Sequence, residues 1–261
     1  MVVRCGLVLS LAATSACFAI EPTPAAVGAF DAYARTVEAR LGNPSCSPNR
    51  SFPGSTPAAG DQARLRRGEL IVESIPLTGG TPHPGALLSH WRGRAFISGA
   101  TTGDFERLLQ DFDDYPRYFV PQVIQARVLS RDGDHLSAAM RIVQHHILTV
   151  TMDTAYDITF RRVDPQCGSS ISRSTSIAEI GSNGRPLQSS EEHGFLWRLN
   201  TYWNYEERDS GLYIQIETIS LTRSVPAGLG WLIGAYVESI PRESLEFTLR
   251  SVCHALQQER K

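Results

Sequence analysis

The sequence predicts an α+β fold in which one curved antiparallel sheet wraps around a long carboxy-terminal helix. The first observation is a strongly periodic helical segment at residues 227–258. The second is the series of strand-like segments before it, which would supply a partner surface for its apolar face. The third is an amphipathic segment at residues 25–41, which predicts an amino-terminal helical extension to this core.

Apolar residues recur at helical spacing along residues 227–258. They are Leu229, Leu232, Ile233, Tyr236, Val237, Ile240, Leu245, Leu249, Val252 and Leu256. Pro241 has no N–H and its ring clashes with the carbonyl four residues back, so we expect a kink or a break there. Residues 227–234 are glycine-rich and apolar on most sides, which favours a buried helix start. A gate over a cavity, or a tip that makes transient membrane contact, is the alternative.

The beginning of the chain has the pattern of a secretory signal over residues 1–19. Arg4 supplies a basic start, a short apolar run follows, and small residues lead to a cleavage site after Ala19 or Ala16. The apolar run is too short to span a bilayer. We therefore expect a periplasmic or secreted protein. Lipoprotein anchoring at Cys17 is less favoured, since a large aliphatic residue normally stands three positions before the acylated cysteine.

Composition and motifs exclude several classes of function. The formal net charge is −2 and the chain has no basic run, which argues against nucleic acid as a partner. Cys46, Cys167 and Cys253 remain after signal cleavage, so at most one disulfide can form among them. Their spacing matches no zinc motif, and the chain has no glycine-rich phosphate loop and no Gly-x-Ser-x-Gly motif. We therefore expect no metal and no cofactor.

The mature chain is expected to comprise an extension at residues 20–86 and a main domain at residues 87–258. The extension holds the first helix, a Pro/Gly-rich loop and a short strand, and we expect it to dock because its apolar faces would otherwise be exposed. In the main domain, Thr101 and Asp104 offer capping side chains for a short helix. Long alternating strands follow it.

Residues 105–123 read F-E-R-L-L-Q-D-F-D-D-Y-P-R-Y-F-V-P-Q-V, a helix that ends at acidic residues before a Tyr-Pro turn. This segment and the order of elements resemble the START-like or SRPBCC superfamily, which includes Bet v 1-like, polyketide-cyclase and coenzyme-Q-binding proteins. The resemblance covers residues 91–256 and implies the helix-grip fold. It also implies a hydrophobic cavity between sheet and long helix, which family members use for lipids, quinones, sterols or polyketides.

Strand alternation predicts which side chains face such a cavity. With an even loop at residues 208–211, one inner face carries Trp197, Leu199, Thr201, Trp203, Tyr205, Ile214, Ile216, Thr218 and Ser220. The opposite face, expected to meet solvent, carries Arg198, Asn200, Tyr202, Asn204, Gln215 and Glu217. An even turn at residues 164–167 sets Met152 and Tyr156 on one face with Arg173 and Glu179. A single bulge would turn both charges outward, and that alternative stays open.

The candidate ligand-binding residues are Met152, Tyr156, Arg173, Glu179, Trp197, Trp203, Ile216 and Ile233. The leading hypothesis is an exported protein that binds a lipid or other hydrophobic small molecule without catalysis. One alternative is a cyclase or aromatase in which Arg173, Glu179 and Tyr156 orient and protonate a carbonyl-bearing substrate. Another is an envelope interaction module whose interior is filled by its own side chains.

Overall fold

The computed structural model describes residues 21–41, 60–77, 85–145, 149–188, 191–224 and 230–258, with side chains of the last segment described from residue 239 onward. The predicted secretory signal and Cys46 lie outside these residues. Within them, no helix is long and apolar enough to cross a bilayer.

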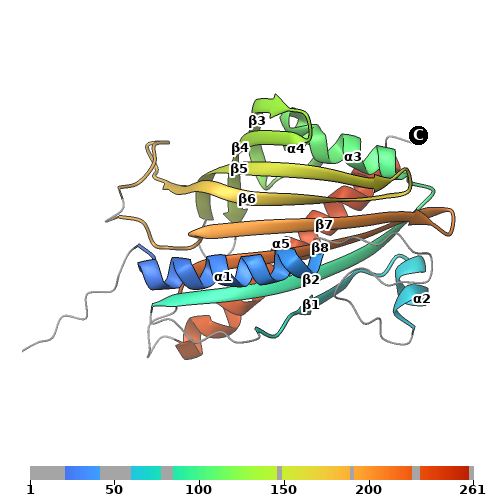
Figure 1. Cartoon of the computed structure of the whole chain (residues 1–261). Coiled ribbons are helices and arrows are strands. Elements are labelled where there is room, and N and C mark those ends of the chain that lie inside the picture. Colours follow the sequence, from blue (N-terminus) through green and yellow to red (C-terminus); the bar gives the residue numbers. More distant parts are fainter. Residues whose placement is uncertain are drawn as a thin grey trace, which may run out of the picture.

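The described chain contains helices at both ends and a run of long strands between them (Figure 1). The helices are α1 (Pro24–Leu41), α2 (Asp61–Arg66), α3 (Thr102–Gln110), the 3-10 turn η1 (Phe112–Asp114), α4 (Tyr115–Tyr118) and α5 (Gly230–Gln258). The strands are β1 (Ile71–Ser74), β2 (Ala86–Ser98), β3 (Val123–Asp132), β4 (His135–His145), β5 (Thr149–Asp164), β6 (Cys167–Ile180), β7 (Arg198–Arg208) and β8 (Gly211–Arg223).

All eight strands form one antiparallel sheet with the order β1-β2-β8-β7-β6-β5-β4-β3. Helix α5 lies across one face of this sheet, here called the inner face, and α1 lies along the other, the outer face (Figure 1). The predicted curved sheet around a carboxy-terminal helix, with an amino-terminal helix added, is therefore confirmed. The main core lies between the inner face, α3 and α5.

Helix α3 begins as its sequence predicts. The Thr101 side chain accepts the backbone N–H of Asp104, and the Asp104 carboxylate accepts the backbone N–H of Thr101, so the two residues form a capping box. Helix α5 runs as one helical element through Pro241, so of the expected kink or break the chain does not show the break. Helix α5 packs closely against β2, because a Cβ added at Gly93 of β2 would lie 2.7 Å from Leu249 Cδ1 of α5.

The extension packs directly on the sheet. Strand β1 pairs with β2 at the sheet edge. Helix α1 buries one apolar stripe on the outer face; the cluster comprises Ala26, Phe30, Ala34, Val37, Leu41, Trp197, Tyr202, Ile219 and Leu221. Docking of the first helix thus follows from its amphipathic pattern.

The coverage of the outer face by α1 corrects one prediction. Glu217 and Tyr202 were expected to meet solvent, but their exposed fractions are 0% and 1%. Under α1, the Glu217 carboxylate lies 2.9 Å from His90 Nε2, accepts the Nε–H of Arg92 at 2.9 Å and is also paired with Arg40. A strand pattern shows which residues share a face, but it cannot show that a distant helix covers that face.

Two cysteines lie within the described residues, and they differ in their state. Cys167, at the start of β6, is disulfide-bonded, and Cys253 on α5 is a free cysteine. Burial raises the pKa of the Cys253 thiol to about 11, so the group stays protonated and unreactive near neutral pH.

Candidate functional site

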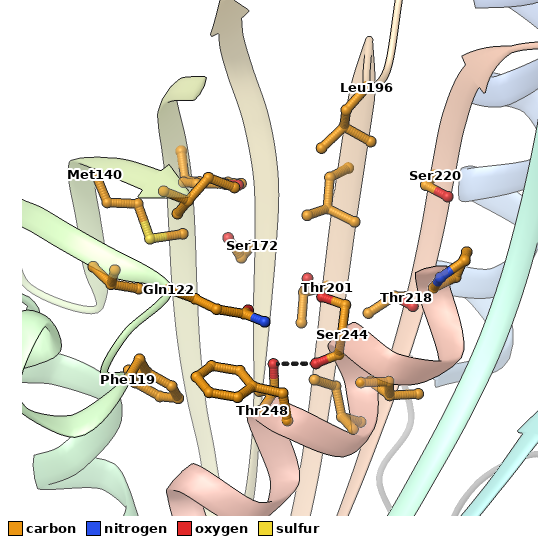
Figure 2. A pocket seen from close by; sticks show the side chains of 18 of the residues that line it. Phe119, Gln122, Met140, Ser172, Leu196, Thr201, Thr218, Ser220, Ser244 and Thr248 are labelled. Carbon is orange, nitrogen blue, oxygen red and sulfur yellow. Dashed lines mark hydrogen bonds between the residues drawn. The ribbon is translucent and has the colours of Figure 1, made fainter. Parts of the chain in front are cut away.

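A cavity of about 250 Å³ lies between the inner face of the sheet and α5. Its apolar wall includes Phe112, Phe119, Ile142, Ile158, Leu199, Trp203, Ile216 and Leu245. Residues from η1 and α4 close one side, the middle strands form the floor, and residues 240–248 of α5 cover it (Figure 2). The described interior is not completely filled by its own side chains, which counts against the filled-core part of the third hypothesis.

A line of hydroxyl groups crosses the floor of this cavity. Ser172 of β6 is paired with Thr201 of β7, and Thr201 is paired with Thr218 of β8. Directly paired residues on one face of a sheet are close neighbours, so these side chains form a continuous row across three strands, here called the hydroxyl row. Figure 2 shows the row facing Ser244 and Thr248 of α5, with the Gln122 side chain reaching in from the side.

Every described side chain that lines the cavity is uncharged. Tyr156 is 3% exposed, and its hydroxyl has no hydrogen-bond partner among the described residues. Burial raises the pKa of Tyr156 to about 12, so the phenol keeps its proton at neutral pH. The site therefore offers hydrogen-bonding groups without charge in an otherwise apolar enclosure.

Arg173 does not join this cavity; the inward position is wrong for it, and the alternative of a bulge that turns it outward is the one observed. The β5–β6 ladder has register shifts that leave Val163 and Thr175 without direct partners. Each extra residue reverses which side chains face inward, so Arg173, which lies between them, points to the outer face. There its guanidinium donates to both carboxylate oxygens of Glu38 on α1, each at 2.8 Å.

Glu179 lies beyond the second shift and opposite Met152, as the even register predicted. It is 4% exposed but does not line the cavity. Its carboxylate accepts the backbone N–H groups of His193 and Phe195 at 3.0 and 3.1 Å. Because Phe195 lines the cavity and is 39% exposed, Glu179 anchors the β6–β7 connection where the cavity meets the surface.

The remaining candidates divide between the two faces. Trp203, Ile216 and Tyr156 line the cavity, whereas Met152 is buried without lining it. Trp197 was expected to point inward, but it precedes β7 and packs in the α1 cluster on the outer face. The alternation rule fails for Trp197 because the residue lies outside the regular strand. The Ile233 side chain lies outside the described part.

Sequence reasoning missed several polar residues of the site. Thr201 and Thr218 were expected on the inner face but were not among the candidate ligand-binding residues. Ser172 was not considered; the bulge at Val163 turns it to the inner face, opposite to the face that an unbroken register would give it. Gln122 lies in an irregular segment after a turn, so no periodic pattern indicates where its side chain points. Ser244 and Thr248 are four residues apart on α5, and this helical spacing is the signal that places both hydroxyls on one face of the helix.

Comparison with known proteins gives likenesses among solved structures only. No family model matches the chain, and no curated protein matches it. One similar structure is a Thermus thermophilus protein with 15% identity and a TM-score of 0.48, covering 65% of this chain and 98% of that chain. Another is a STAR-related lipid transfer protein of Xanthomonas axonopodis with 16% identity and a TM-score of 0.45, covering 68% and 97%.

A third similar structure is an aromatase/cyclase of a Streptomyces species, with 11% identity and a TM-score of 0.48, covering 67% of this chain and 97% of that chain. The fold itself follows from the sheet order and from the position of α5 on the inner face. The chain has a helix-grip fold, in which one antiparallel sheet holds a long carboxy-terminal helix against its inner face.

Proposed function

We propose that this protein is exported and binds a lipid or other hydrophobic small molecule in the cavity between the sheet and α5. The observation that carries the proposal is the cavity of about 250 Å³ with its largely apolar, uncharged lining. Ligand sites are typically concave and mostly apolar with a few placed polar groups. Export is supported by the signal-like residues 1–19 and by the disulfide at Cys167, since disulfides persist mainly in oxidising compartments.

Binding without chemistry is favoured by the positions of the charged residues. The cyclase alternative relied on Arg173 and Glu179 beside Tyr156. Arg173 pairs with Glu38 on the outer face, and Glu179 holds the backbone of the β6–β7 connection. Neither lines the cavity, so Tyr156 alone of the three remains next to a bound molecule.

The test is a titration with a neutral apolar fluorescent probe, N-phenyl-1-naphthylamine, against two variants of β6. Ser172→Phe places a ring in the cavity, whereas Ser176→Phe places the same ring at an exposed position of the same strand. We expect saturable probe binding to the mature wild type and to Ser176→Phe, and loss of binding in Ser172→Phe. Equal binding by both folded variants would place the probe elsewhere and contradict the proposal.

A further inference from the structure

The polar groups of the cavity have unused hydrogen-bonding capacity. Within the described chain, none of the hydroxyls of the hydroxyl row has a partner in the protein, and each of these residues is only partly buried. Buried or half-buried hydroxyls are normally satisfied by protein, water or ligand. Their remaining partner must therefore be something that occupies the cavity.

The chemistry of these groups selects among ligands. Serine and threonine hydroxyls both donate and accept, and Gln122 adds an amide that does the same. No described lining residue supplies a positive charge for a carboxylate or phosphate, or a negative charge for an amine. An ion moved into this enclosure would lose its hydration without gaining a partner, which is far more costly than moving a neutral polar group.

We infer that the ligand is an uncharged, oxygen-bearing hydrophobic molecule, such as a long-chain alcohol, ketone or ester, whose oxygen hydrogen-bonds to the hydroxyl row. This inference rests on the proposed function and names the chemical class of the ligand. Apolar walls at Phe119, Ile158 and Trp203 receive the hydrocarbon part. Anionic lipids and amines of equal length are disfavoured by the same site.

The test is displacement of N-phenyl-1-naphthylamine at pH 7.4 by compounds that share a ten-carbon chain. Decane has no polar group, 2-decanone only accepts, 1-decanol donates and accepts, and decanoate and decylammonium are charged. We expect the alcohol and the ketone to displace the probe at concentrations at least tenfold lower than either ion. Displacement by decanoate or decylammonium as effective as by decanol would overturn the inference while leaving the proposed function intact.

The double variant Thr201→Val/Thr218→Val tests the hydroxyl row itself, because valine keeps the shape and removes the hydroxyl. We expect the preference for decanol over decane to fall about tenfold, with binding of decane kept, since each hydrogen bond contributes a few-fold in affinity. Thr151→Val is the matched control, because Thr151 lies on β5 away from the cavity. An unchanged preference in the folded double variant would overturn the role of the row.

These measurements separate the two levels of the proposal. If the probe binds the wild type but the ions compete best, only the ligand class is wrong. If the probe does not bind and no ten-carbon compound stabilises the wild type against thermal unfolding, the proposed function fails and the ligand class fails with it.

Discussion

At the residue scale, the main feature of the site is that no charged side chain among the described residues lines it. Arg173 and Glu179 were the two charges expected inside, and the structure gives each a structural partner instead. Arg173 is paired with Glu38 across the α1 interface, and Glu179 is capped by backbone N–H groups. The cavity is thereby left with hydroxyl and amide groups.

Replacing Arg173 by Leu tests the outward position of this residue. We expect ligand retention to be unchanged, since the side chain is on the far side of the sheet. Stability should fall by less than about 1 kcal/mol, because the ion pair with Glu38 is partly exposed and screened by solvent. Probe affinity and urea unfolding measure the two effects, and loss of binding in a stable Arg173→Leu protein would return the residue to the site.

Replacing Glu179 by Gln tests its role in holding the β6–β7 connection. The amide keeps one acceptor oxygen but loses the negative charge, and its NH2 group replaces the oxygen that accepts the second bond from His193, so the connection that carries Phe195 should loosen. We expect faster probe release in stopped-flow measurements, with equilibrium affinity changed less than the release rate. Glu191→Gln is the control, because Glu191 accepts a single N–H from Gln188 within the same connection. Identical release rates in wild type and Glu179→Gln would refute the anchoring role.

At the scale of elements, the docking of α1 depends on a buried charge cluster as well as on its apolar stripe. Glu217 is the centre of this cluster, with Arg40 from α1 and His90 and Arg92 from β2 around it, and Gln215 donates a further hydrogen bond at 3.1 Å. Tyr33 of α1 lies 2.8 Å from the other ring nitrogen of His90. Removing one charge from such a cluster leaves the others uncompensated.

The Glu217 cluster predicts a pH-dependent contribution to stability. Burial alone would raise the pKa of Glu217, but hydrogen bonds from His90 and Arg40 and the charge of Arg92 lower the pKa to about 2. Because the pKa is lower in the folded protein than its ordinary value of 4.5, the ionised carboxylate stabilises the folded state at pH values above 4.5. This stabilisation is lost as the pH falls from 4.5 towards 2. The difference between the two pKa values corresponds to about 3 kcal/mol in the free energy of unfolding at neutral pH.

We therefore expect Glu217→Gln to lower the free energy of unfolding by about 3 kcal/mol at pH 7, with the difference from wild type shrinking below pH 4.5. Urea unfolding across this pH range measures it. Glu69→Gln, which removes an exposed carboxylate paired with Arg64 and Arg67, should change little. A pH-independent difference for Glu217→Gln would contradict the depressed pKa.

The approach of α5 to the sheet also depends on one small residue. An added Cβ at Gly93 would meet Leu249 at 2.7 Å and Ile216 at 3.2 Å. We expect Gly93→Val to cost about 1–3 kcal/mol through overpacking and to weaken probe binding, because α5 covers the cavity. Gly28→Ala on α1, where nothing lies within 4 Å, should be neutral or stabilising. Unchanged stability in Gly93→Val would show that α5 can shift without cost.

At the scale of the whole molecule, periodicity in the sequence is enough to predict the arrangement of the sheet and α5. The long apolar stripe from Leu245 to Leu256 needed a concave partner, and the alternating strands supplied it. The register of β7 and β8 was also predictable, because a two-residue turn joins them without a bulge. Thr201, Trp203 and Ile216 consequently lie on the inner face as expected.

The errors at Arg173 and Glu217 have separate physical causes. A bulge adds one residue without changing composition, so the local sequence around Val163 and Thr175 carries no periodic signal that fixes the face of Arg173. Coverage of a sheet face by α1 joins residues about 180 positions apart, as in the pair Arg40 and Glu217, and alternation cannot report such a contact. Neither the bulge nor the covering helix leaves a signal in the alternation of a single strand.

The most direct test of the account is the content of the cavity in the protein as it is made. The mature protein, exported in a bacterial host and purified without detergent, would be compared by native and denaturing mass spectrometry after organic extraction. We predict a stoichiometric, extractable, uncharged hydrophobic molecule in wild type and in Ser176→Phe, and its absence from Ser172→Phe. A spectrum of ligand-free protein for wild type, unchanged after incubation with long-chain alcohols or ketones, would contradict the claim that this fold encloses a hydrophobic ligand.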